Sequence, residues 1–413
     1  MRDAVGAAAY EWDEVGRLKS VRRRGGVGIS YAYDALGRLT TYSLGGANTV
    51  EYEYDFMGRV AAMKTPAGPI TYQYQTGDGR VVRTLPNGVR TVWESEPSGK
   101  LRAITHSDTK FVIAKFSYDY RPDGLIGRIV EWSPRGEKTL TCEYDTVQRL
   151  VGYTDSTGKK WQAEYDPLGN RTKAVINGSQ VVEARYDWAG RLTAFAGETC
   201  THDASGNLIR GRFNGGQRQF EYDHDNRVQR VNQGEVAYEY DGDGFMVART
   251  VGGKRTTFIP DTTTDIWRPL QATTPQGKQR FYVWEGRTPL ATVEDGQVTF
   301  ILQDQLGSAR CLVDQAGKVI ERRDYSAYGE CSTLTNKLEF SPGFAGLFWD
   351  GSVSAYLTRA RIYGPELGRF LQTDPQHRVP MGAQADLSVY AYCGGDPVNW
   401  FLATFSGCIE KVC

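Results

Sequence analysis

Two acidic stretches of the sequence carry the residue types that bind calcium. Asp223-His-Asp225 and Asp241-Gly-Asp243 each begin like a calcium-binding loop, in which alternate side chains supply oxygen ligands. Arg227 and Phe245 stand at the third ligand position, and neither side chain offers an oxygen. Because Asp and Gly also favour tight turns, the sequence predicts polar turns here and no metal site.

Other catalytic and ligand-binding patterns are incomplete as well. Gly242-Asp-Gly244 starts a phosphate-binding pattern, but Val247 stands where the third glycine belongs. The sequence has no Gly-x-Ser-x-Gly or Cys-x-x-Cys motif, and its histidines are never paired at the spacing of a metal site. The histidines are His106, His202, His224 and His377. The sequence therefore predicts no cofactor, no metal and none of the common enzyme classes.

The seven cysteines are few and odd in number. They are Cys142, Cys200, Cys311, Cys331, Cys393, Cys408 and Cys413. A disulfide framework in a small secreted protein is usually denser and even. We expect free thiols, because cysteine is a common small apolar residue of protein cores.

Charge and composition exclude several classes of protein. Lys and Arg together (49) equal Asp and Glu together (49), so no global field attracts nucleic acid or an anionic membrane. No apolar run reaches the ~20 residues of a membrane span, and the first ten residues lack the apolar stretch of a secretory signal. The 24 Tyr, 9 Trp and 47 Gly favour many short strands joined by tight turns.

A repeat supplies the elements that would position any site. The run Tyr10–Leu18 recurs as Tyr31–Leu39 and as Tyr52–Val60, and the aspartates within it fall at 13, 34 and 55, a spacing of 21. A fixed period of this size indicates a repeat architecture. Decayed and intact copies continue along the chain, and twelve units can be traced before residue 250.

Each repeat has the chemistry of a β-hairpin. Tyr31 and Tyr33 alternate along a strand and so share one face of it. Asp34 and Gly37 stand first and fourth in a type I turn, where Gly supplies any left-handed conformation. Arg38 begins the return strand. A lone hairpin is marginally stable, so the units must stack, and we predict an all-β spiral of hairpins.

The pattern changes at about residue 253, and ordered motifs follow. Strands are expected at 256–259 and 280–284, and a hairpin at 290–301. The later motifs are Asp304–Arg310, Asp314–Gly317, Asp324–Gly329, Thr358–Pro375, Val389–Tyr392 and Asp396–Trp400. With the repeats, these motifs resemble the RHS/YD-repeat family, whose core signature contains R-A-R-Y-Y-D-P-x-x-G-R-F-x-x-x-D-P followed by N-x-Y-x-Y and N-P-x-x-x.

The resemblance implies a shell protein. It predicts a YD-repeat hairpin spiral over 1–252, an RHS repeat-associated core over 253–400 and a short divergent tail over 401–413, too short for a toxin domain. Family members include bacterial polymorphic toxins, the encapsulating subunit of insecticidal toxin complexes and teneurins. In the toxins the repeats wind into a cocoon around a C-terminal toxin. We expect a truncated shell without cargo, and the sequence leaves open whether it closes.

The resemblance also implies partners and a location. Relatives bind a toxin polypeptide or a component of a secretion apparatus, and they act in competition between bacteria. They are made in the bacterial cytoplasm, and full-length relatives are secreted or delivered to the cell surface. The sequence does not fix the location of this chain, and it names neither a toxin nor an immunity protein.

One catalytic site follows from the resemblance alone. In toxin-carrying relatives the core holds an aspartyl protease that releases the toxin. The aspartate of G-R-F-x-x-x-D-P matches Asp374, and a basic residue of the same signature matches Arg361. Such chemistry needs two carboxylates that share a proton. The second usually lies in a D-P-x-G-L segment, but Leu402 stands at that position. Asp386 and Asp396 are alternative second carboxylates.

Structural roles compete with the catalytic ones. Asp374 would then shape an Asp-Pro turn, and Arg361 would pair with a nearby carboxylate or carbonyl. We therefore expect a non-enzymatic shell. The two rival hypotheses are a self-cleaving aspartyl protease and a surface module for adhesion or carbohydrate binding, the latter because Tyr and Trp rings also stack on sugars.

Overall fold

A computed structural model describes residues 2–3, 6–23, 26–75, 77–213, 215–332, 340–375, 388–402 and 409–411. Over these ranges the chain forms forty β-strands and three single turns of 3₁₀-helix, and it contains no α-helix. The predicted all-β class is confirmed.

The first and largest sheet has 20 strands, each antiparallel to its neighbours. Its strands are β1 (Arg2–Asp3), β2 (Gly6–Trp12), β3 (Leu18–Arg23), β4 (Ile29–Tyr33), β5 (Leu39–Leu44), β6 (Asn48–Tyr54), β7 (Val60–Thr65), β8 (Gly68–Gln75), β9 (Arg80–Thr84), β10 (Arg90–Ser95), β11 (Leu101–Ser107), β12 (Val112–Tyr120), β13 (Ile126–Ser133), β14 (Gly136–Tyr144), β15 (Leu150–Asp155), β16 (Lys160–Tyr165), β17 (Arg171–Ile176), β18 (Gln180–Tyr186), β19 (Leu192–Phe195) and β20 (Glu198–Thr199).

A second sheet of 13 strands continues the spiral. It comprises β21 (Thr201–His202), β22 (Leu208–Phe213), β23 (Gly216–Tyr222), β24 (Val228–Val231), β25 (Val236–Tyr240), β26 (Met246–Val251), β27 (Lys254–Pro260), β28 (Pro269–Thr273), β29 (Gln279–Glu285), β30 (Thr288–Glu294), β31 (Gln297–Gln303), β32 (Ala309–Val313) and β33 (Val319–Arg322). This sheet runs without a break through residue 252, so the proposed domain boundary there stays a prediction.

Two small sheets complete the chain. The first comprises β34 (Phe340–Pro342), β35 (Phe348–Asp350), β36 (Ala355–Leu357), β37 (Ile362–Gly364) and β38 (Arg369–Phe370), and the second β39 (Trp400–Leu402) and β40 (Ile409–Lys411). The 3₁₀ turns are η1 (Asn232–Gly234), η2 (Phe344–Gly346) and η3 (Cys393–Gly395).

The repeat turns have the predicted geometry. In the second unit the amide of Gly37 donates to the carbonyl of Asp34 at 3.0 Å, and Gly37 has a φ of 82°. The Asp34 carboxylate accepts hydrogen bonds from the amides of Leu36 and Arg38 and from the Arg38 guanidinium. The strand register shifts between Ala32 and Tyr33, so the turn is flanked by a β-bulge.

Tyrosine links each repeat to the one before it. The last residue of a repeat strand donates its hydroxyl to a backbone carbonyl at the start of the preceding return strand. The pairs run from Tyr33 to Leu18 (2.9 Å), Tyr54 to Leu39 (2.7 Å), Tyr165 to Leu150 (2.7 Å) and Tyr186 to Arg171 (2.8 Å). These tyrosines occupy equivalent strand ends, as the 21-residue period predicts.

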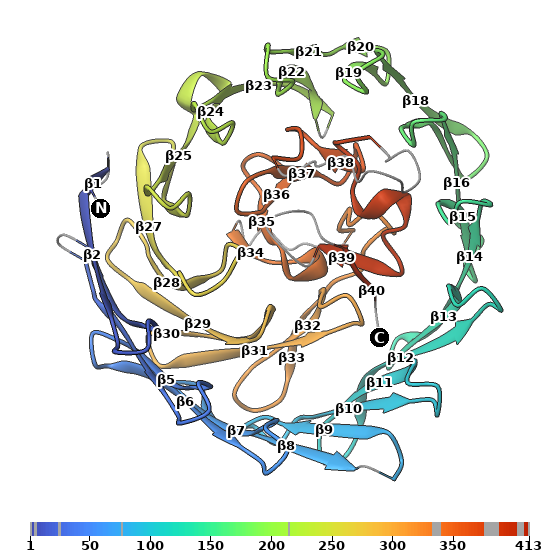
Figure 1. Ribbon diagram of the computed structural model, residues 1–413. Helices are drawn as coiled ribbons and strands as arrows, with labels where there is room; N and C mark the ends of the chain where they lie inside the picture. The colour runs from blue at the N-terminus through green and yellow to red at the C-terminus, as the bar shows by residue number, and fades with distance from the viewer. Residues whose placement is uncertain are drawn as a thin grey trace.

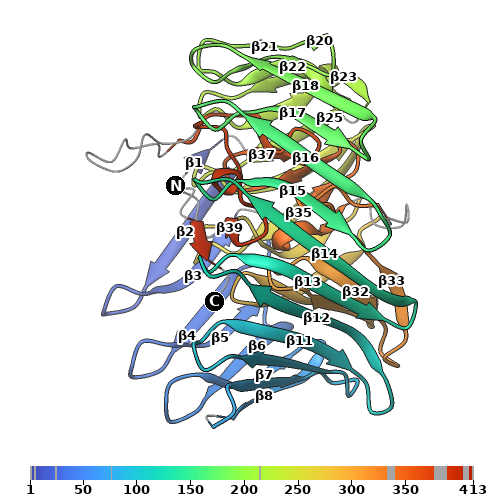
Figure 2. The ribbon, with the colours of Figure 1, turned by 90° about the vertical axis from the view of Figure 1, so that its right-hand side faces the viewer.

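The sheets coil so that one turn of the spiral lies inside another. We call β2–β24 the outer turn and β25–β33 the inner turn (Figure 1). Side chains join the two at large separations in sequence: Arg23 to Asp241 (218 residues), Arg83 to Gln303 (220) and Asn87 to Asp314 (227). Apolar residues of both turns, such as Tyr72 and Phe300, belong to one buried cluster. Figure 2 shows the hairpins stacked along the spiral.

The core segment, which we define as residues 340–375 and 388–399, lies at the centre of the ring (Figure 1). It docks on the hairpin tips of the outer turn. Ser388 donates its amide to Leu168 at 2.8 Å, and Arg369 donates to the carbonyl of Gly190 at 2.7 Å. The spiral therefore positions the motifs that the sequence places last.

Candidate functional site

Arg361 and Asp374 are brought together by two short strands of the core segment. Thr358 and Arg361 close a tight turn before β37, in which each backbone amide is hydrogen-bonded to an oxygen of the other residue. Asp374 lies four residues after β38, and its amide donates to the carbonyl of Val389 at 3.0 Å. Antiparallel pairing of β37 with β38 then carries the two side chains to the same place.

The two side chains form a buried ion pair. Arg361 Nη2 lies 3.1 Å from Asp374 Oδ2, with 4% and 18% of the respective side chains exposed. The Arg361 guanidinium also stacks on the Phe370 ring, with Cζ 3.7 Å from the ring centre. Burial lowers the pKa of Arg361 to about 10, and the Asp374 carboxylate opposes this effect. The pair has the geometry of a structural ion pair, the alternative considered from the sequence.

Of the two alternative second carboxylates, the structure describes Asp396 but not Asp386. Asp396 is buried, and its carboxylate accepts hydrogen bonds from the amides of Val398 and Asn399 and from the Asn399 side chain. Asn399 in turn accepts the amide of Ile126 at 2.7 Å. Asp396 therefore orients the asparagine that anchors the core segment to β13. Asp386 lies outside the described residues.

Leu402 is described only by its backbone, which pairs with Ile409 in the β39–β40 hairpin. Its side chain is outside the described part of the chain. The catalytic assignment of Asp374 and Arg361 consequently stays a prediction, with its second carboxylate unplaced.

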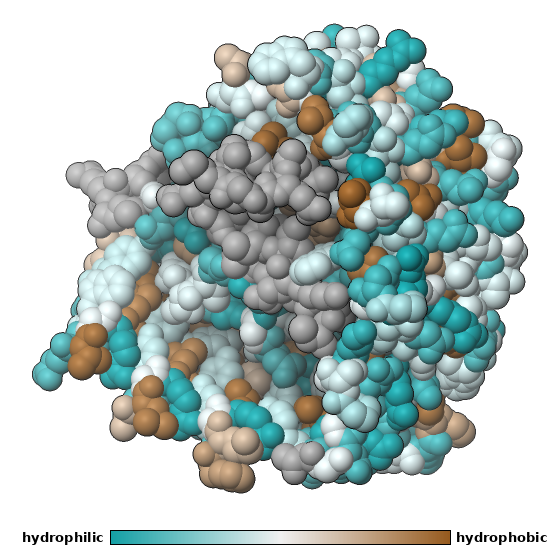
Figure 3. Space-filling model, turned by 45° about the vertical axis from the view of Figure 1, so that its right-hand side comes forward, coloured by the Kyte–Doolittle hydropathy of each residue, from teal (hydrophilic) through white to brown (hydrophobic). Residues whose placement is uncertain are grey.

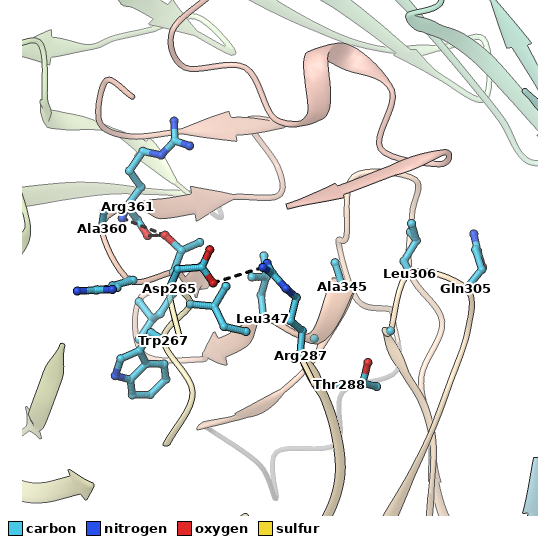
Figure 4. A pocket seen from close by; sticks show the side chains of 16 residues that line it. Asp265, Trp267, Arg287, Thr288, Gln305, Leu306, Ala345, Leu347, Ala360 and Arg361 are labelled. Carbon is cyan, nitrogen blue, oxygen red and sulfur yellow. Dashed lines mark hydrogen bonds and ion pairs between the residues drawn. The ribbon is translucent and has the colours of Figure 1, made fainter. Parts of the chain in front are cut away.

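A small cavity adjoins the turn that holds Arg361 (Figure 4). It has a volume of about 110 Å³ and lies between the core segment and loops of the inner turn. Asp265 and Arg287 form an ion pair at its side, 3.3 Å apart. In Figure 4 the Arg361 guanidinium extends away from this pair. A volume below the ~300 Å³ of typical ligand pockets makes it a poor substrate site.

The structure contains a second buried ion pair that the sequence analysis did not predict. Arg249 of β26 donates two hydrogen bonds of 2.6 Å to Asp350 of β35, and Tyr238 donates a third of 2.7 Å. Asp350 is fully buried. The cluster joins the inner turn to the core segment. No sequence signal points to it, because Asp350 stands outside every recurring motif.

The role of arginine in the repeat was also missed, although its signal was present. Arg17, Arg38 and Arg59 each follow a repeat aspartate by four residues and pair with it at 2.6 to 2.7 Å. The same guanidiniums lie over the next tyrosine ring, as Arg38 does over Tyr54 at 4.4 Å. The constant spacing of Asp and Arg would have predicted the pair.

The hydrogen bond from the Arg17 amide lowers the pKa of Asp13, the aspartate of the first repeat turn. This aspartate is therefore held in its charged form, in which it accepts hydrogen bonds from both the backbone and the side chain of Arg17.

The remaining sequence predictions concern metals and thiols. The Asp223 carboxylate accepts hydrogen bonds from the amides of Asp225 and Arg227, so the polar-turn interpretation is confirmed. Among the described residues there is no cluster of three acidic, histidine or cysteine side chains suited to a metal ion. Among the described residues, Cys142, Cys200, Cys311 and Cys393 are free thiols, as expected. Cys408, Cys413 and His377 lie outside the described ranges.

Taken together, the fold and the core motifs define a shell of stacked YD hairpins. The family described as Teneurin YD-shell matches residues 102–398, and the family RHS Repeat matches residues 12–49 and 33–70. The chain belongs to the YD-shell family. In the described ranges no helix has the length and apolar character needed to cross a membrane.

Relatives in sequence include two bacterial proteins, a nuclease and a deaminase toxin. The tRNA nuclease WapA of Bacillus subtilis is 26% identical over 267 residues, covering 62% of this chain and 11% of the relative. The double-stranded DNA deaminase toxin A of Burkholderia cenocepacia is 25% identical over 323 residues, covering 68% and 22%.

In structure, the chain is similar to TcdB2-TccC3-TEV, with a TM-score of 0.77 and 17% identity over 98% of this chain and 24% of that one. The chain therefore spans less than a quarter of the length of these relatives.

Proposed function

We propose that this chain is part of a shell that encloses another polypeptide. The observation that carries the proposal is the nesting of the turns. The inner turn lies inside the outer turn, and the core segment lies inside both (Figure 1). Such a wall has one face turned to solvent and one face turned inward. The toxin relative supports a toxin polypeptide as the enclosed partner.

The experiment is a protease challenge of a fusion. An unstructured reporter of ~60 residues rich in lysine is fused after Cys413, because β39 and β40 lie within the ring in Figure 1. Trypsin should cleave this reporter at least tenfold more slowly than the same reporter fused to an unrelated soluble domain. Equal cleavage rates would rule out enclosure by this chain.

We propose further that the shell does not cut its cargo. Two observations support this view: Asp374 is paired with Arg361, and Asp396 is committed to Asn399. A general acid and base pair needs two carboxylates at one water, one ionised and one protonated. The relatives named above are a nuclease and a deaminase, and those activities are properties of the much longer proteins.

Adhesion through exposed aromatic rings receives less support. The exposed aromatic side chains include Trp12, Phe56 and Trp188, which lie at or beside turns of different hairpins. Figure 3 shows apolar residues singly or in small groups among hydrophilic ones on the face it presents. Sugar-binding sites usually need several rings in one patch. Carbohydrate remains the alternative partner, to be tested by glycan-array binding.

A further inference from the structure

A large cavity lies on the inward face of the inner turn. It has a volume of about 630 Å³ and is lined by residues of β29–β33 and β34. Phe281, Tyr282 and Val283 of β29 all belong to the large buried cluster, which Tyr282 joins through the Phe348 ring, 5.5 Å away in the core segment. Arg280 and Tyr282 share one face of this strand and line the cavity. In Figure 1, β34 lies on the inner side of these strands.

The cavity wall is electrically balanced. Its three basic residues are each paired with an acidic one: Lys278 with Asp295 (2.8 Å), Arg280 with Glu294 (2.7 Å) and Arg323 with Glu321 (2.6 Å). A balanced wall does not attract a polyanion or a polycation. Between the pairs lie neutral side chains, among them Tyr282, Ile301, Leu312 and the cross-strand pair Thr292 and Thr299.

Two buried polar side chains, Arg323 and Ser341, line the cavity. Arg323 is 1% exposed; its Nε donates to Glu321 and its Nη1 to the carbonyl of Pro342, each at 2.6 Å. Among the described residues no acceptor lies in good hydrogen-bond geometry to its Nη2 or to the Oγ of Ser341, which is 4% exposed, although the Tyr325 hydroxyl also interacts with the Arg323 guanidinium. Ser341 directly precedes Pro342, whose carbonyl accepts from Arg323, and both side chains line the cavity. Buried donors without acceptors are costly, and an acceptor there would be stabilised.

We propose that this cavity binds an extended segment of the enclosed polypeptide through one aspartate or glutamate side chain. The carboxylate oxygens accept hydrogen bonds from Arg323 Nη2 and Ser341 Oγ, and charge-assisted bonds of this kind are strong. Neighbouring side chains of the segment pack on Thr292, Thr299 and Ile320, lining residues that are at least partly exposed. The balanced wall favours a single acidic residue among apolar and hydroxyl residues over an acidic run. This inference rests on the proposed function, because it assumes an enclosed chain.

The test measures peptide binding to the complete purified chain. The probe is a fluorescein-labelled peptide, Thr-Val-Thr-Asp-Val-Thr-Val. The control peptide carries the same label and has Asn in place of Asp. Fluorescence anisotropy should give at least tenfold tighter binding for the Asp peptide. Ser341→Ala should weaken binding of the Asp peptide about tenfold, because a hydrogen bond to a charged group is lost. Ser179→Ala, at an exposed turn, is the matched control and should change nothing.

Two substitutions of opposite charge at one position distinguish an electrostatic effect on binding from an effect of misfolding. Thr299 lines the middle of the cavity and is partly exposed. Thr299→Glu should weaken binding of the Asp peptide at least tenfold, and Thr299→Lys, of similar bulk, should retain or strengthen it. Equal effects of the two substitutions would overturn the proposal, as would equal binding of the Asp and Asn peptides or no binding of either.

Two further outcomes identify which idea fails. Competition by sodium glutarate as effective as that by unlabelled peptide would show a site for small carboxylates and overturn the peptide assignment. A reporter protected from trypsin without peptide binding would contradict this inference alone. Peptide binding with an unprotected reporter would contradict the proposed enclosure.

Discussion

At the residue scale, the repeat is a set of polar contacts that local sequence determines. The carboxylate of each such Asp accepts hydrogen bonds from backbone amides of its own turn and forms an ion pair with the Arg four residues later. The guanidinium of that Arg lies over the Tyr ring of the next repeat. Hydrogen-bonded polar groups of this kind stabilise only where both partners are present. The chain offers tyrosines with and without such a partner, and these can be compared directly.

Tyr54→Phe should lower the free energy of unfolding by about 1 kcal/mol, because the bond to the Leu39 carbonyl is lost. Tyr42 is the matched control. Its hydroxyl is buried without a hydrogen-bond partner among the described residues, so Tyr42→Phe should be neutral or stabilising. Urea unfolding followed by circular dichroism measures both. A larger loss for Tyr42→Phe would contradict the proposed role of the tyrosine link.

Gly37→Val tests the turn. The φ of 82° at Gly37 is unfavourable for a β-branched residue, and a new Cβ would meet only Arg17 Nη1 at an ordinary contact distance of 3.9 Å, so the cost is conformational. We expect a loss of about 1 to 2 kcal/mol. Ala35→Val, at an exposed position of the same turn, should change the unfolding midpoint little. Equal thermal shifts for the two variants would argue against the turn assignment.

At the element scale, sequence reasoning succeeds where contacts are local. The hairpins and their turns are set by residues within one 21-residue unit, so Tyr33 and Asp34 were placed correctly. The nesting of the turns was not predicted, because the partner of Arg83 lies 220 residues away and depends on accumulated twist. The Arg361–Asp374 contact was suggested only as a general pairing of Arg361, since spacing alone cannot set its geometry.

His106 makes a buried contact between the two turns. Its Nε2 lies 2.8 Å from the carbonyl of Gln303 and its Nδ1 2.9 Å from the Thr91 hydroxyl. A carbonyl only accepts, so Nε2 carries the proton and Nδ1 accepts from Thr91. Burial lowers the pKa of His106 to about 3, and the facing cations Arg83 and Arg310 add to this effect against the Gln303 bond. The imidazole is therefore neutral in the folded protein.

The free energy of unfolding should consequently decrease as the pH is lowered. Between pH 6.5, the ordinary pKa of histidine, and about 3, the unfolded chain binds a proton at His106 that the folded chain does not. This residue alone then removes up to about 1.4 kcal/mol of stability per pH unit as the pH drops. His106→Gln should flatten the pH dependence of the urea midpoint over this window. His224→Gln, at an exposed site, should leave the slope unchanged.

At the scale of the whole molecule, stability should be spread along the spiral, because each hairpin packs mainly on its neighbours. Long-range ties such as Arg249 to Asp350 then join the inner turn to the core segment. A buried ion pair of this kind is costly to break, since one charge is left without its partner. The core segment is thus held by the shell on several sides, and its chemistry depends on the wall around it.

The last prediction concerns cleavage by this core. Purified protein should remain one chain of 46.0 kDa. Asp374 and Arg361 are present and paired, but Leu402 stands where the resemblance places a second aspartate. The prediction takes Asp374 as the one carboxylate of this site, and one carboxylate does not provide both the acid and the base that hydrolysis requires. Mass spectrometry of the intact protein after prolonged incubation is the direct measurement.

A repair experiment makes the prediction decisive. Leu402→Asp is combined with Pro-Leu-Gly-Leu at positions 403–406, and a reporter domain is fused downstream. If the wall is otherwise competent, the repaired fusion should release the reporter, and a further Asp374→Asn change should abolish release, because the ionised and protonated carboxylates must act together. Release from the unrepaired fusion would mean that another carboxylate, such as Asp386, already completes the pair. Failure of the repaired fusion would show that the core needs more of the shell than this chain supplies.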